Sequence, residues 1–93
     1  MRVDLALKYL CLVKSRSSVK HLCDDAAVLV NDQPVKPSTP LRTGDRVSIH
    51  FPNRILTIEL LDVPEKQLSK SRSAAYYRKT GEVQTGSEDA PDE

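Results

Sequence analysis

The spacing of apolar residues changes once along this 93-residue chain, and the change restricts the folds available to it. Over the first 26 residues, apolar side chains recur at steps of three and four, as on one face of a helix. Between residues 28 and 60 they alternate with polar side chains, as in strands with one buried face. This order predicts an α+β domain in which two short N-terminal helices pack on a small antiparallel sheet.

Two helices are expected in the first part of the chain. The first is predicted over residues 3–13 from its apolar stripe, Val3, Ala6, Leu7, Leu10 and Val13. A break at residues 14–18 holds three serines, any of which can cap the second helix because a hydroxyl accepts hydrogen bonds from free first-turn amides. The second stripe is Val19, Leu22, Cys23 and Ala26. Asp24 and Asp25 predict its end, because negative charge is unfavourable near a helix C-terminus.

Short strands are predicted at residues 28–30, 33–35, 46–51 and 55–60, the last being the final strand of the sheet. Asn31-Asp32 predicts a tight hairpin turn, because both residue types tolerate positive φ. With the helices, these strands predict a core of Leu7, Leu10, Val13, Leu22, Val30, Val47, Ile49 and Ile58.

Three regions are expected along the chain. Residues 1–63 form the folded domain, and residues 64–80 form a basic extension with room for one short helix around residues 73–77. Residues 81–93 combine glycine, serine, proline and acidic side chains without apolar patterning, which predicts an acidic tail without stable structure.

The residue types argue against an enzyme. His21 and His50 are isolated, and the three glycines do not have the spacing of a phosphate-binding loop, so neither a catalytic residue nor a cofactor is expected. Cys11 and Cys23 are too few for a four-ligand zinc site and are expected as free thiols packed like small apolar groups, so no metal is expected. The chain lacks a bilayer-length apolar run and a secretory signal, which predicts a cytoplasmic protein without a membrane partner.

Basic residues at the junction of the two helices form the candidate binding site. Arg16 and Lys20 are four residues apart and share a helix face, with Lys14 just before them and Arg2 at the opening of the first helix. The free amides at the start of that helix and the Ser17 hydroxyl add donors, a combination that suits phosphate. An ordinary solvated charged face is the simpler interpretation of such a cluster. A DNA-binding helix-turn-helix also fits two short helices, but the sheet downstream and the short second helix argue against it.

The residues around this junction also resemble a known family, the S4-type RNA-binding domain or alpha-L motif. The similarity runs across residues 1–61 and is carried by Met1-Arg2-Val3-Asp4, Leu7-Lys8, Lys14-Ser15-Arg16-Ser17, Lys20, Val28-Leu29-Val30-Asn31, Val35-Lys36-Pro37 and Gly44-Asp45. The opening Met-Arg-x-Asp resembles the stand-alone group that contains bacterial heat-shock protein fifteen and the ribosome quality-control protein P. Residues 72–77 resemble the segment that follows the domain in that group.

The resemblance implies a non-catalytic, cytoplasmic and monomeric RNA-binding protein. Members of that group bind large ribosomal subunits that still carry a nascent chain on tRNA, which implies ribosomal RNA and tRNA as partners in ribosome-associated quality control or rescue of stalled translation. The residues implied to contact RNA are Arg2, Lys14, Ser15, Arg16, Ser17, Lys20, Asn31 and Lys36. Asn31 also has the residue type of a turn position.

The chain departs from the family pattern at several positions. Basic residues are usual where it has Leu5 and Cys11, and glycine is common where it has Ala26 and Asp32. Two alternatives therefore stay open: a general binder of structured RNA, such as tRNA or a ribosomal precursor, or a protein-interaction module that has lost RNA binding.

Overall fold

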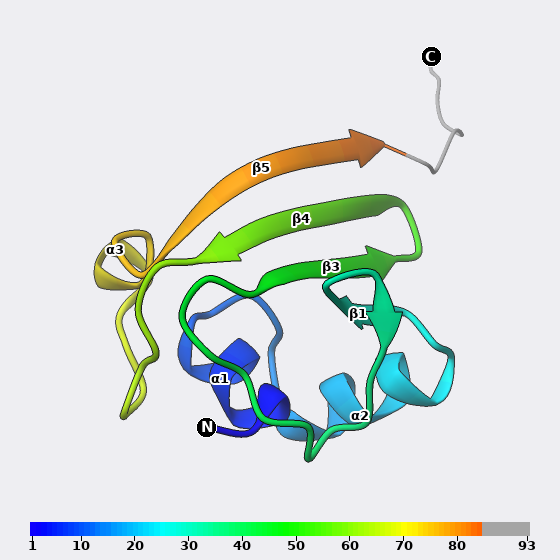
Figure 1. Ribbon diagram of the computed structural model, residues 1–93, viewed down its shortest axis with the longest axis horizontal. Coiled ribbons are helices and arrows are strands. Elements are labelled where there is room, and N and C mark those ends of the chain that lie inside the picture. Colours follow the sequence, from blue (N-terminus) through cyan, green and yellow to red (C-terminus); the bar gives the residue numbers. More distant parts are fainter. Residues whose placement is uncertain (85–93) are drawn as a thin grey trace.

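Two helices lie against one face of a five-stranded antiparallel sheet in this computed structural model, which describes residues 1–84 (Figure 1). The sheet has the order β2-β1-β3-β4-β5. The elements are α1 (Val3–Tyr9), α2 (Arg16–Asp24), β1 (Val28–Val30), β2 (Gln33–Pro34), β3 (Arg46–Phe51), β4 (Arg54–Leu60), α3 (Lys70–Ser73) and β5 (Tyr77–Gln84). The predicted α+β class is confirmed. None of the described helices is long and apolar enough to cross a bilayer.

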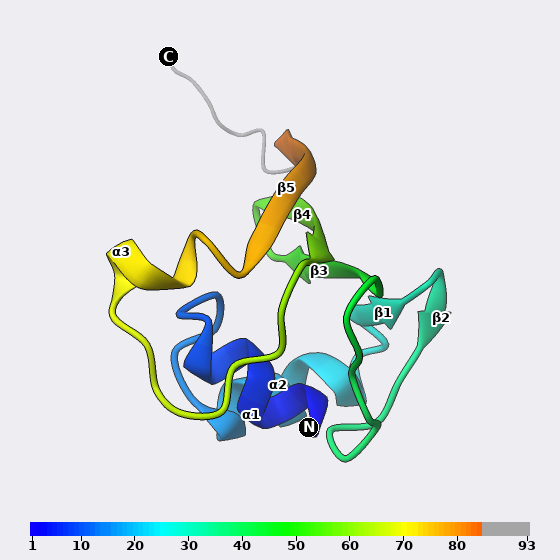
Figure 2. The ribbon, with the colours of Figure 1, turned by 60° about the vertical axis from the view of Figure 1, so that its left-hand side comes forward.

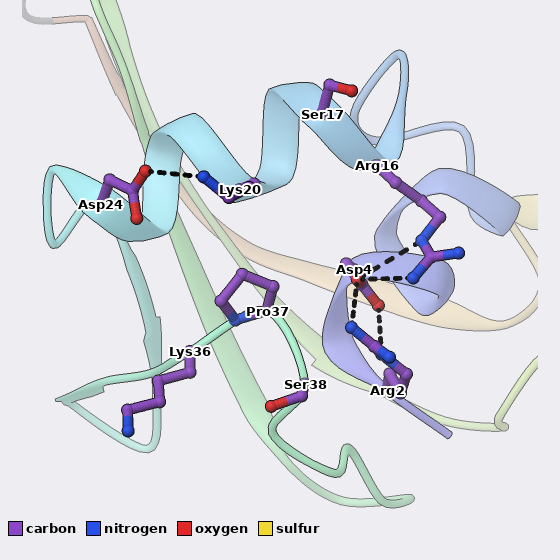
Figure 3. Close-up of a pocket in the computed structure, with 9 residues that line it drawn as sticks. All are labelled: Arg2, Asp4, Arg16, Ser17, Lys20, Asp24, Lys36, Pro37 and Ser38. Carbon is purple, nitrogen blue, oxygen red and sulfur yellow. Dashed lines mark hydrogen bonds and ion pairs between the residues drawn. The ribbon is translucent and has the colours of Figure 1, made fainter.

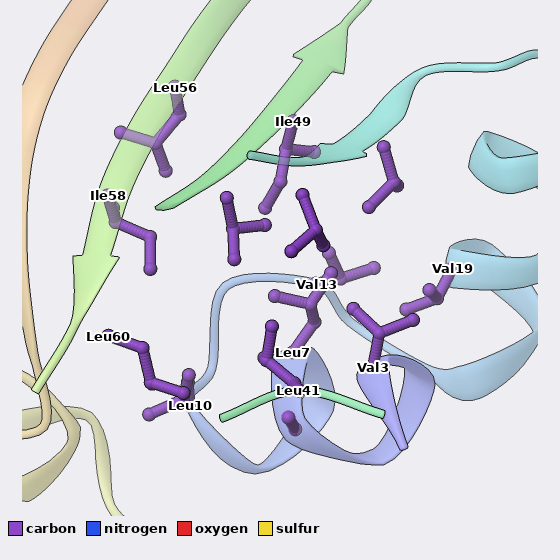
Figure 4. Close-up of a cluster of buried hydrophobic side chains, with 14 of the residues drawn as sticks. Val3, Leu7, Leu10, Val13, Val19, Leu41, Ile49, Leu56, Ile58 and Leu60 are labelled. Atoms are coloured by element: carbon purple, nitrogen blue, oxygen red, sulfur yellow. The ribbon is translucent and has the colours of Figure 1, made fainter. Parts of the chain in front are cut away.

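The core lies between the two N-terminal helices and the sheet (Figure 4). The predicted stripe of the first helix is buried, whereas that of α2 buries only Val19 fully, with Leu22 and Cys23 half-buried and Ala26 exposed. β3 and β4 bury alternate residues because side chains on a strand point to opposite faces. The fully buried side chains include Val3, Leu7, Leu10, Val19, Val28, Val47, Ile49, Ile58 and Leu60. Leu22 of the predicted core is only half-buried and packs against the edge of this cluster.

Both N-terminal helices end in the same hydrogen-bonded motif. At the end of α1, the amide of Cys11 donates to Lys8 O at 3.0 Å and that of Leu12 to Leu7 O at 3.1 Å. This is the Schellman arrangement, and it requires a left-handed residue, here Cys11 with φ of 61°. The helix therefore ends at Tyr9 and not at residue 13 as predicted. The apolar stripe misled because Leu10 and Val13 stay in the core after the helix has ended.

The end of α2 repeats the motif with Ala26 at the left-handed position. Its φ is 55°, and the Ala27 amide donates to Leu22 O at 2.8 Å. A left-handed conformation costs an L-residue more than it costs glycine. We expect Ala26→Gly to raise the free energy of unfolding by about 0.5–1 kcal/mol, after glycine's greater chain entropy is subtracted.

Thermal unfolding followed by circular dichroism measures this change. Ala74→Gly is the control, because Ala74 has a right-handed φ of −61° and offers no strain to relieve. An Ala26→Gly variant that melts at or below the wild-type temperature would contradict the expected gain.

The predicted hairpin turn is confirmed. Asn31 and Asp32 have φ of 52° and 70°, and Val30 pairs with Gln33, so two residues connect β1 to β2. Two successive positive φ values suit the twist of a two-residue hairpin. Asp32, like Ala26, has a left-handed backbone conformation, which glycine adopts more easily than other residues.

The last strand was missed by the sequence analysis. β5 pairs with β4 from Leu60↔Tyr77 to Arg54↔Gln84, so β4 is not the final strand and the predicted boundary at residue 80 falls inside a strand. The short helix is α3, at residues 70–73, and not a helix centred on residues 73–77. The tail expectation is wrong for residues 81–84, while residues 85–93 lie outside the described part of the chain. β5 is an edge strand with mostly exposed side chains, so it has no apolar alternation to detect.

The linker between β4 and α3 is attached to the end of α1. Figure 2 shows it curving around the α1 side of the molecule before it reaches α3. The Leu68 amide donates to Tyr9 O at 3.2 Å, and the Cys11 thiol donates to Leu68 O at 3.2 Å. Cys11 and Cys23 are both free thiols, and burial raises the pKa of the Cys23 thiol, with Asp24 and Asp4 acting in the same direction.

Candidate nucleic-acid interface

A hollow of about 630 Å³ lies where the start of α1, the exposed side of α2 and the loop after β2 meet (Figure 3). Four cationic side chains line it, against two carboxylates. We call it the basic hollow, and its residues are Arg2, Asp4, Arg16, Ser17, Lys20, Asp24, Lys36, Pro37 and Ser38.

One buried carboxylate holds the two arginines of the basic hollow. The Asp4 side chain is 4% exposed, and Arg2 meets it with two nitrogens, at 3.1 Å to Oδ1 and 3.0 Å to Oδ2. Arg16 approaches Oδ2 from α2 with two nitrogens, each at 3.4 Å. The Leu5 amide completes the set by donating to Oδ1 at 2.7 Å. Asp4 thus links α1 to α2, and its partners compensate a carboxylate charge that would be costly to bury alone.

The two guanidinium groups remain available to a ligand. The side chains of Arg2 and Arg16 are 47% and 50% exposed, and a guanidinium has five N–H donors, of which Asp4 takes only some. Because the carboxylate already orients both groups, less side-chain entropy is lost when an anion binds. Two oriented guanidinium groups side by side are suited to the oxygens of phosphate.

The loop after β2 forms one side of the basic hollow and is hydrogen-bonded to the start of α1. The first amides of a helix lack partners within it, and no side chain caps α1. Carbonyl groups of the loop accept hydrogen bonds from these amides: the Val3 amide donates to Thr39 O at 2.9 Å and the Asp4 amide to Pro37 O at 3.1 Å. A turn between Lys36 and Thr39 shapes the loop, with the Thr39 amide donating to Lys36 O at 3.0 Å. The loop therefore closes one side of the basic hollow with Lys36, Pro37 and Ser38, and Lys36 lies across the hollow from the two arginines (Figure 3).

The start of α2 contributes further donors. Ser15 is the cap, and its Oγ accepts from the Ser18 amide at 3.1 Å. No acceptor within residues 1–84 contacts the amides of Arg16 and Ser17. Lys20 pairs with Asp24 at 3.5 Å, but both side chains are well exposed, and such a surface pair is weak enough for a phosphate to replace the carboxylate.

The structure brings together five of the eight predicted site residues: Arg2, Arg16, Ser17, Lys20 and Lys36. Three lie outside the basic hollow. Lys14 is exposed but does not line it, and Ser15 is used as the helix cap. Asn31 has a structural task in the β1–β2 turn, where its side chain accepts from the Arg46 amide at 3.0 Å and donates to Asp45 Oδ1 at 3.2 Å.

The residue that organises the basic hollow, Asp4, was not predicted from the sequence. Asp4 was noted only as part of the Met-Arg-x-Asp opening. An acid two residues after Arg2 was the available signal, but nothing in the sequence places Arg16 beside the same carboxylate. Asp24, Pro37 and Ser38 also line the hollow and were not predicted.

A small α+β domain with oriented arginines at a helix pair beside a short sheet has the chemistry of the nucleic-acid-binding class. The model of the S4 domain family matches residues 1–47. The chain therefore belongs to the S4 domain family, as its sequence resemblance implied.

Relatives of known name are similar over most of the chain. The RQC P-site tRNA stabilizing factor of Halalkalibacterium halodurans is 32% identical over 88 residues, which cover 95% of this chain and 100% of that protein. The protein of the same name from Helicobacter pylori is 36% identical over 64 residues, covering 69% of this chain and 76% of that one. The trimeric structure of Vibrio cholerae Heat Shock Protein 15 shares the fold, with a TM-score of 0.79 at 22% identity over 86% of this chain and 81% of that chain.

Proposed function

We propose that this protein is a non-catalytic RNA-binding protein that acts on the large ribosomal subunit in quality control of stalled translation, contacting ribosomal RNA and tRNA. The observation that carries the proposal is the pair of half-exposed arginines held by the buried carboxylate of Asp4. This arrangement is suited to an RNA backbone, and the relatives named RQC P-site tRNA stabilizing factor support the ribosome as the place of action.

The chemistry of the described residues supports binding without catalysis. The basic hollow has donors for phosphate but no nucleophile paired with a base. The raised pKa of Cys23 keeps that thiol protonated at neutral pH, which makes it a poor nucleophile. We propose that the protein works as a monomer in the cytoplasm, where ribosomes are found.

The proposed RNA contacts fall into two groups. Arg2, Arg16, Ser17, Lys20 and Lys36 contact phosphates in the basic hollow. Lys14, Ser15 and Asn31 lie outside it, so any contact that they make is at its periphery.

Sedimentation of tagged protein through a sucrose gradient, followed by sequencing of crosslinked RNA, tests this function. We expect co-migration with large subunits and crosslinks to both ribosomal RNA and tRNA. Crosslinks to free tRNA or precursor RNA alone would favour a general binder of structured RNA. The absence of any RNA would favour a protein-interaction module.

The affinity should depend steeply on salt. If four to six phosphates are contacted, the logarithm of the binding constant should fall with the logarithm of salt concentration with a slope of about −3 to −5. The reason is the release of condensed counterions when cations neutralise phosphates. Filter binding at several salt concentrations measures the slope, and tight binding with a flat dependence would contradict phosphate contact.

A further inference from the structure

A second set of cationic side chains lies outside the basic hollow. It lines a separate hollow between the α1–α2 loop, β4, α3 and β5, which shares no residue with the first. We call it the β5 hollow, and the residues used here are Leu12, Arg54, Lys70, Tyr77, Lys79 and Glu82.

The register of β5 places these side chains on the core-facing side of the sheet. Tyr77 pairs with Leu60 and Lys79 with Ile58, both buried, so Tyr77 and Lys79 share their face. A register shift between Thr57 and Ile58 then brings Glu82 opposite the buried Leu56. Such an irregularity redirects side chains, which explains why Lys79 and Glu82 lie on one face despite their odd separation.

All three cations of the β5 hollow are open to solvent, and two of them are held in place by ion pairs. Glu82 pairs with Arg54 at 3.0 Å and with Lys79 at 2.9 Å. The Arg54 guanidinium also lies over the Phe51 ring, 4.7 Å from its centre. The side chains of Arg54 and Lys79 remain 40% and 57% exposed, and Lys70 is exposed without an ion pair among residues 1–84. Three cations against one carboxylate leave positive charge for an anion.

An aromatic side chain distinguishes the β5 hollow from the basic hollow. Tyr77 is half-buried at the edge of the core and lines the β5 hollow, with the half-buried Leu12 nearby. No aromatic residue lines the basic hollow. A cationic groove combined with an aromatic surface is the usual means of holding unpaired nucleotides, because the phosphate meets the cations and the base stacks on the ring.

We propose that the β5 hollow binds an unpaired nucleotide of RNA. Arg54, Lys70 and Lys79 contact its phosphate, and Tyr77 contacts its base. The proposal rests on the proposed RNA-binding function and divides the work between two sites. The basic hollow contacts the backbone of structured RNA, and the β5 hollow, which the C-terminal extension completes, contacts a single-stranded segment beside it.

Filter binding of the full chain to two RNAs tests this division. One probe is a blunt hairpin, and the other is the same hairpin with a single-stranded 3′ extension. We expect wild-type protein to bind the extended hairpin about tenfold more tightly, since stacking of one base supplies roughly that factor. Lys70→Glu and Tyr77→Leu should each remove most of this gain and leave the affinity for the blunt hairpin unchanged. Tyr77→Leu retains an apolar contact with the core.

The controls separate this proposal from the RNA-binding function itself. Lys66→Glu changes an exposed cation that does not line the β5 hollow and should preserve the gain. Arg16→Glu should weaken both probes equally. Equal wild-type affinity for both probes, or a gain that survives Lys70→Glu, overturns the β5 site while the RNA-binding function stands. Wild-type protein that binds neither probe overturns both. If Tyr77→Leu does not fold, Lys70→Glu decides the outcome alone.

Discussion

Arg16→Glu is expected to weaken binding to RNA or to large ribosomal subunits at least tenfold, which corresponds to roughly 1.4 kcal/mol or more. The substitution removes one of the two guanidinium groups oriented by Asp4 and places a negative charge in the basic hollow. Lysine could not replace the planar fork of donors that an arginine presents to phosphate. The fold should persist, because the Arg16 side chain is half exposed and Arg2 still pairs with Asp4.

A matched control shows whether the loss is local. Arg54, at the start of β4, is not suitable as the control because it pairs with Glu82 and stacks on Phe51. Lys66→Glu makes the same change in charge at an exposed residue without an ion pair in residues 1–84.

Both variants belong in one filter-binding or co-sedimentation series, with circular dichroism as the check on folding. Arg16→Gln, which removes the charge without adding an acid, should show a smaller loss in the same direction. Equal losses at Arg16 and Lys66 would indicate a diffuse effect of net charge. Unchanged binding at Arg16 would remove the helix junction from the RNA-binding surface.

Leu10→Ala is expected to lower the free energy of unfolding by about 2–5 kcal/mol. Leu10 is fully buried in the core cluster, so the substitution removes apolar contacts and leaves a cavity that neighbouring side chains fill only in part. A loss of this size is a large part of the roughly 5–15 kcal/mol that stabilises an ordinary domain. Urea denaturation measures it.

Leu61→Ala removes the same atoms from the surface. Leu61 is 46% exposed, so its truncation should change the free energy of unfolding by only about 0.5 kcal/mol. Similar losses for the two variants would show that Leu10 does not occupy the core position that the structure gives it.

The features that the sequence predicted correctly are those with a local physical signal. Both N-terminal helices and the strands up to β4 follow from the spacing of apolar residues, since a buried face imposes its own period. The β1–β2 turn follows from Asn31 and Asp32, whose side chains tolerate positive φ. The end of α1 was wrong because the spacing reports which residues are buried and not where the backbone stops being helical.

The candidate site was predicted in part for the same reason. Arg16, Ser17 and Lys20 lie close together in the sequence on one helix, so their shared face is a local property. Arg2 was predicted from its place at the opening of the first helix and Lys36 from the family resemblance, and the structure places both in the same hollow as Arg16. Asp4 became central only when α1 and α2 packed together and brought a second arginine to its carboxylate.

By itself, therefore, the sequence determined the α+β class, the helix pair, the strands as far as β4 and the basic residues of α2. Only the tertiary structure decided that β5 completes the sheet, that Asp4 orients two arginines and that Arg54 and Lys79 share a carboxylate. β5 has few apolar residues to bury, and β4 stabilises it through backbone hydrogen bonds that carry no side-chain signal. Contacts between distant segments depend on how the helices and strands pack, so no local pattern reports them.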